Sequence, residues 1–213
     1  MMPKTRKHIL CLAFLTALGT SFSFHAQAQL QLEIEKAPEA APKIAIIPFA
    51  NDSSIYPIIE QDLNRSGKFT SSSKNLPATA SMDNPNAAAW QSSGVPYVVT
   101  GNIKQNANGG YDVQYQLYDV EKKQYLLSEV LTVPANRIRS AAHLISDTIY
   151  EALTGIKGDF SGRIAYVLRN PATPSERYTL QIADTDGEQP RTVLTSRDPI
   201  LSPAWNQIGR AHV

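Results

Sequence analysis

The chain has 213 residues, of which 42% are hydrophobic and 18% charged, and its 20 Lys+Arg and 19 Asp+Glu give a net charge of +1. This near balance excludes the strongly basic surface that nucleic-acid and anionic-membrane binding proteins use. The single cysteine excludes a disulfide within the chain and a site built from several cysteine ligands.

Residues 1–28 have the plan of a secretory signal peptide. Basic residues precede an apolar run, Ile9–Leu18, and small residues at Ala26 and Ala28 form a cleavage site. The run is too short for a transmembrane helix, which needs about 20 apolar residues. We expect a secreted mature chain that begins at Gln29 and has lost the only cysteine. Removal of three basic residues changes its net charge to about −2.

The first segment of the mature chain, Leu30–Glu35, alternates apolar and polar residues and predicts a half-buried strand. A Pro/Ala-rich hinge, Ala37–Pro42, follows it. The segment is either an edge strand of its own domain or a detachable strand that pairs with a partner's sheet. The residues alone leave both readings open.

Residues 43–104 predict alternating strands and helices. Lys43–Phe49 is typical of a strand buried on both faces. The i, i+4 spacing of Ile55, Ile59 and Leu63 predicts a helix that ends at Gly67. A short strand, a proline-containing loop, a brief helix and another strand are expected at Phe69–Ser72, Ser73–Asn84, Asn86–Ser92 and Tyr97–Lys104.

Residues 108–155 predict a hairpin and a long helix. A turn at Asn108–Gly110 precedes a strictly alternating strand from Tyr111, which pairs with Tyr125–Val133. A helix capped by Asn136 carries an apolar stripe and ends at Gly155. Residues 29–158 are therefore expected to form an α/β domain, a mixed sheet with helices on one side, that folds by itself.

After Gly158 the pattern changes to short strands without helices, at Arg163–Arg169, Tyr178–Ala183 and Arg191–Thr195. Such serial antiparallel strands are typical of a propeller blade. We assign residues 159–206 to the first blade of a truncated all-β propeller, whose apolar faces lack the neighbouring blades. Residues 207–213 contain a stretch that a common sequencing adapter encodes, and we interpret them as an artefact.

The polar residues give little support to an enzyme or a metal site. His143 is expected at the surface beside Arg139 and Asp147, and a Ser-His-Asp site would require a nucleophile near it. Asp184-x-Asp186-Gly187 has some features of a calcium loop but lacks its closing glutamate, so a hairpin turn is the better interpretation. We predict no catalytic residue, cofactor or metal.

Several stretches together resemble the TolB family of the Tol–Pal envelope system: Ile58–Phe69, Tyr111–Asp119, Ala142–Gly155, Arg163–Val167 and Leu201–Trp205. In the family the last stretch continues as Ser/Asn-Pro-Asp-Gly, and here the chain departs from that pattern after Asn206.

The resemblance implies a periplasmic, non-enzymatic scaffold that links the inner-membrane protein TolA to the outer-membrane lipoprotein Pal and supports outer-membrane integrity and constriction at cell division. Pal contact is implied for the propeller and TolA contact for the mature amino terminus, namely Gln29, Leu30, Gln31, Leu32, Glu33, Ile34 and Glu35. The alternative is the accessory propeller of a secreted peptidase or glycan-active enzyme.

Overall fold

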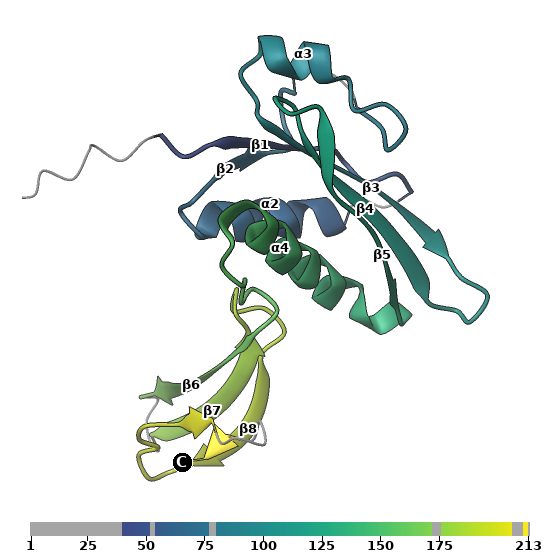
Figure 1. Cartoon of the computed structure of the whole chain (residues 1–213). Coiled ribbons are helices and arrows are strands. Elements are labelled where there is room, and N and C mark those ends of the chain that lie inside the picture. Colours follow the sequence, from purple (N-terminus) through teal and green to yellow (C-terminus); the bar gives the residue numbers. More distant parts are fainter. Residues whose placement is uncertain (1–39, 52–53, 77–79, 172–175, 206–210, 213) are drawn as a thin grey trace, which may run out of the picture. The chain divides into compact units, whose positions relative to one another are not determined.

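The computed structural model describes residues 40–51, 54–76, 80–171, 176–205 and 211–212 (Figure 1). The predicted signal peptide and the predicted strand Leu30–Glu35 lie outside these residues, so both stay predictions. None of the described helices is both long and apolar enough to span a bilayer.

A five-stranded mixed sheet forms the first part, in the order β2-β1-β3-β4-β5. Its strands are β1 (Lys43–Ile46), β2 (Thr70–Ser72), β3 (Tyr97–Gln105), β4 (Tyr111–Asp119) and β5 (Gln124–Val133). β1 pairs in parallel with β2 and β3, because the chain crosses back through a helix each time, whereas β3, β4 and β5 form an antiparallel meander.

Helices α2 (Ile55–Arg65) and α4 (Ile138–Thr154) lie side by side on one face of this sheet (Figure 1). A one-turn 3₁₀ helix, Ala135–Arg137, leads into α4. The middle of the apolar stripe of α4 is fully buried, with Ala142, Ile145 and Ile149 each at 0% exposure. These residues meet Ile46, Val99 and Leu117 in the larger of the two cores.

The opposite face of the sheet has a smaller core, which corrects the expectation of helices on one side only. Helix α3 (Ala87–Ser92) places Trp90 at 0% exposure against Ala45, Val98 and Tyr118. Ala45 and Val98 alternate along their strands with residues of the larger core, as the two-residue period of a strand requires.

The second part is a three-stranded antiparallel sheet of β6 (Arg163–Asn170), β7 (Arg177–Asp184) and β8 (Arg191–Ser196), in that order. It confirms the three predicted blade strands. Several of its large apolar side chains are exposed, including Ile164, Leu168 and Val193. β9 (Ala204–Trp205) pairs antiparallel with β10 (Ala211–His212).

Candidate functional site

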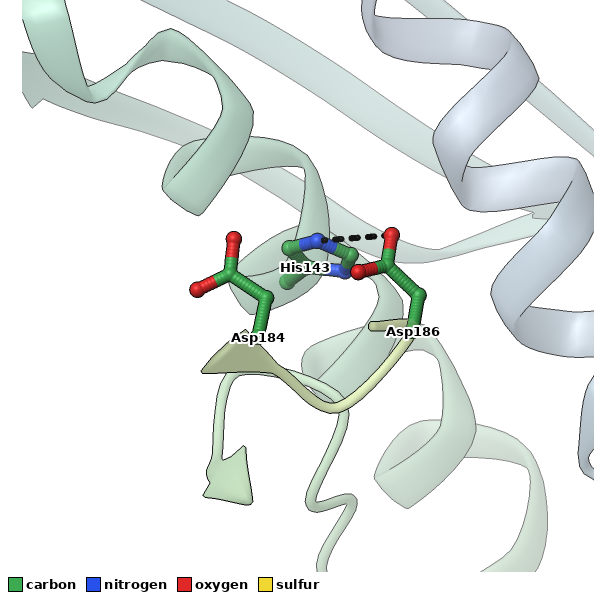
Figure 2. A group of neighbouring side chains, drawn as sticks. All are labelled: His143, Asp184 and Asp186. Atoms are coloured by element: carbon green, nitrogen blue, oxygen red, sulfur yellow. Dashed lines mark ion pairs between the residues drawn. The ribbon is translucent and has the colours of Figure 1, made fainter. Parts of the chain in front are cut away.

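A group of charged side chains connects α2 and α4 with the turn that follows β7. We call it the charged cluster, and it consists of Asp62, Arg139, His143, Asp184 and Asp186. Figure 2 shows His143 on α4 facing the two aspartates of the turn. Arg139 and His143 are four residues apart on α4, so they occupy one face of that helix, beside its apolar stripe.

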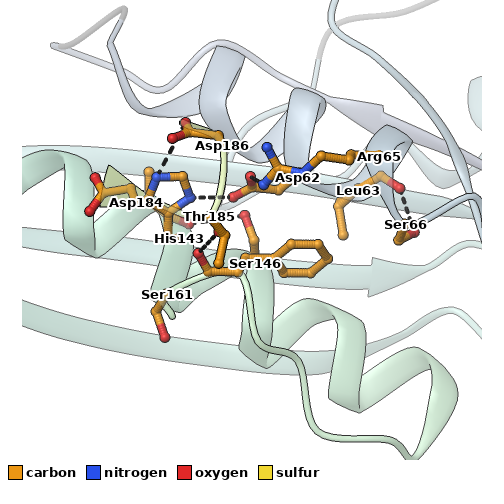
Figure 3. A network of polar contacts seen from close by, with 12 residues as sticks. Asp62, Leu63, Arg65, Ser66, His143, Ser146, Ser161, Asp184, Thr185 and Asp186 are labelled. Atoms are coloured by element: carbon orange, nitrogen blue, oxygen red, sulfur yellow. Dashed lines mark hydrogen bonds and ion pairs between the residues drawn. The ribbon is translucent and has the colours of Figure 1, made fainter. Parts of the chain in front are cut away.

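His143 is at the centre of the cluster and is 1% exposed. Its Nδ1 lies 2.7 Å from Oδ2 of Asp62 in α2, and its Nε2 lies 3.7 Å from Oδ2 of Asp186 (Figure 3). The sequence-based expectation of a surface histidine is therefore wrong. It failed because a helical projection of α4 does not show that α2 and the β7–β8 turn cover this side.

Asp62 is buried to the same degree, with 1% exposure. Besides His143, it accepts a hydrogen bond at Oδ1 from Arg65 Nη2 at 2.8 Å, one turn further along α2. Both oxygens of this carboxylate are therefore paired, as a buried charge requires. The pairing fixes the position of the imidazole ring.

The β7–β8 turn supplies the other two carboxylates. Gly187 adopts φ +86°, which allows the chain to reverse, and its N–H donates to the Asp184 carbonyl at 2.9 Å. The Asp186 side chain is only 1% exposed, contacts Nη2 of Arg139 and accepts a hydrogen bond from the Glu188 N–H at 3.0 Å. Arg139 Nε lies 3.5 Å from Oδ2 of Asp184. The predicted hairpin turn is thus confirmed.

The segment that joins α4 to β6 is fixed to the same helix. Asp147, one turn beyond His143, accepts backbone hydrogen bonds from Phe160 at 2.6 Å and Ser161 at 3.1 Å. Thr185 of the turn donates to the Phe160 carbonyl at 2.6 Å. A Cβ on Gly158 would approach the Cα of Asp147 to 2.6 Å, so this close passage of two backbones requires glycine.

The cluster has the donor set of a metal site, since atoms of His143, Asp184 and Asp186 lie within 4.8 Å of one another. Arg139 contacts both aspartates, however, and a metal ion bound to them would meet the guanidinium charge at close range. A hydrolytic triad does not fit either. Both nitrogens of His143 face carboxylates, so in the described residues neither is placed to take a proton from a serine.

The predicted partner-binding residues, Gln29–Glu35, lie outside the described residues and stay a prediction. Sequence reasoning missed the cluster. The available signal was the i, i+4, i+8 series Arg139, His143 and Asp147 beside an apolar stripe, because polar residues so close to a buried stripe need partners.

Comparison with known proteins identifies both parts of the chain. Residues 30–126 match the TolB amino-terminal domain, and residues 150–211 match the TolB beta propeller domain. The chain belongs to the TolB family. The first part is therefore the TolB amino-terminal domain, and β6–β8 are strands of the TolB propeller.

Individual relatives agree with this assignment. The Tol-Pal system protein TolB of Acinetobacter baylyi is 73% identical over 201 residues, which cover 94% of this chain and 47% of the relative. That of Alcanivorax borkumensis is 38% identical over 98% of this chain and 50% of the relative. The crystal structure of TolB from Acinetobacter baumannii superposes with a TM-score of 0.75 at 73% identity, over 81% of this chain and 43% of that one. The chain thus spans about half the length of the relatives it matches.

Proposed function

We propose that this chain is the amino-terminal half of a periplasmic scaffold of the Tol–Pal system, without enzymatic activity. The observation that carries the proposal is the succession of two TolB domains in one chain, at 73% identity to a protein named for that system. The position of His143 between two carboxylates supports a structural rather than a catalytic role for this histidine. No feature of the described residues favours the peptidase-associated alternative.

We further propose that the scaffold contacts TolA through Gln29–Glu35 and Pal through the propeller. Strand addition fits the first contact, because an alternating segment offers backbone hydrogen bonds along its edge and apolar side chains on one face. The Pal contact would require blades beyond β8. The mature chain starting at Gln29 should therefore bind TolA, and bind Pal weakly or not at all.

Calorimetric titration of the mature chain with purified TolA and Pal tests the proposal. Replacing the apolar face of the segment (Leu30, Leu32 and Ile34 by Ser) should weaken TolA binding at least tenfold. Replacing the other face (Gln31 and Glu33 by Ser) is the matched control and should change it little. Equal losses from both variants, or none, would place the TolA contact elsewhere. Native-strength Pal binding would contradict the assignment of Pal to the propeller.

A further inference from the structure

We propose that the Asp184–Asp186 turn fixes the first propeller blade to the α/β domain through its contacts with Arg139 and His143. We call this set of contacts the ionic latch. This inference concerns the described residues alone and does not depend on the Tol–Pal assignment. Arg139 and His143 lie on α4, and Asp62 on α2 contacts the ring nitrogen of His143 that faces away from the turn (Figure 3).

Arg139 and His143 have different roles in the latch: Arg139 supplies the positive charge, and His143 positions Asp186. Arg139 contacts Asp186 through Nη2 and lies 3.5 Å from Asp184 through Nε, so one guanidinium serves both aspartates of the turn. His143 bridges Asp186 to Asp62 across α4 and α2. The turn is therefore attached to α4, and the contact between His143 and Asp62 joins this part of α4 to α2.

Because these groups are buried, the contacts of the latch should form and break together. The side chains of Asp62, His143 and Asp186 are each no more than 2% exposed. Removing a partner of a buried carboxylate leaves that charge buried and unpaired, which is much more costly than losing an exposed pair. The latch should therefore open as a unit when any central member is removed.

The neighbouring contacts point to the same function. Asp147 holds the chain immediately before β6, and Thr185, between the two latch aspartates, donates to that segment. Tyr150 of α4 packs edge-on against Phe160, with ring centroids 5.6 Å apart. The latch thus closes a loop whose other end is already fixed to α4, so the blade has two attachments to one helix.

A bound metal ion is the competing explanation of the same residues. The 3.7 Å between His143 Nε2 and Asp186 Oδ2 is long for a hydrogen bond, and two ligands of one ion could stand at such a distance. Arg139 decides against it, because the guanidinium already neutralises the carboxylates that the ion would need. The two explanations make opposite predictions for a chelator.

Hydrogen exchange on the mature chain starting at Gln29 tests the latch. In Asp186→Asn we expect amides of β6–β8 to exchange on the order of 100-fold faster, while β3 and β4 keep their protection. His143→Gln should behave in the same way. Glu188→Gln, an exposed change in the same turn, is the matched control and should leave exchange unchanged.

A double-mutant cycle between Arg139→Gln and Asp186→Asn should be strongly non-additive, with the double variant no more labile than Asp186→Asn alone. Additive effects would overturn the latch. So would unchanged exchange in Asp186→Asn, an equal loss of protection in β3 and β4, or a wild-type blade that is unprotected from the start. Faster exchange of the wild-type blade in EDTA, or a saturable slowing of its exchange by Zn²⁺, would show that these residues form a metal site and not an ionic latch.

Discussion

Tyr115 shows how one buried polar group links two strands of the sheet. It is 3% exposed, and its hydroxyl donates to Oε2 of Glu129 at 2.6 Å across the β4–β5 pair. Burial, and then the hydrogen bond to Glu129, raise the pKa of Tyr115 well above its usual value. The neutral phenol is thus the form that the folded state requires.

We expect this residue to make the domain sensitive to alkali. A tyrosine whose pKa is raised by folding contributes its stability below the unfolded-state pKa of about 10 and loses it as the pH rises above that value. Tyr115→Phe should cost about 1 kcal/mol at pH 7, for the lost hydrogen bond, and should flatten the decline above pH 10. Urea unfolding between pH 7 and 11 measures both effects. Parallel declines in the two proteins would contradict the assignment.

At the scale of elements, the sequence predicted the helices and strands of the described residues well, because most have a strong local pattern. The stripe from Ile138 to Leu153 predicted α4, and the alternation from Tyr111 to Leu117 predicted β4. What it could not show was which elements meet. The burial of His143 depends on α2 and on a turn that is distant in sequence, and periodicity within α4 contains no information about either.

Helix α3 is a six-residue element whose effect on stability should come from one side chain. Trp90 is fully buried in the smaller core, and its indole N–H has no hydrogen-bond partner among the described residues. Trp90→Ala should cost about 3–5 kcal/mol because it leaves a large cavity. Trp90→Phe should cost much less, since it retains a ring and removes the unpaired donor. Denaturant unfolding compares the two, and equal costs would contradict the assignment of the stabilisation to the buried ring.

At the scale of the whole molecule, the charged cluster changes the expectation for the α/β domain alone. A chain of residues 29–158 lacks the exposed apolar residues of β6–β8 and should be more soluble. It also lacks Asp184 and Asp186, which leaves Arg139 without the partners seen here and opens His143 to water. The domain should fold, but its thermal midpoint should lie several degrees below that of residues 29–206. An unchanged midpoint would mean that the turn adds nothing to the helices.

The cluster also has a consequence for the order in which the molecule forms. Asp62 and His143 are 81 residues apart, and Arg139 and Asp186 are 47 residues apart, so their contacts close long loops. We expect contacts that close loops of this length to form late, after the local hairpins β3–β4–β5 and β6–β7–β8 have paired. Interactions absent from the folding transition state act on the unfolding rate and leave the folding rate almost unchanged. The buried charges should therefore give the molecule kinetic stability: they change the folding rate little and mainly slow unfolding.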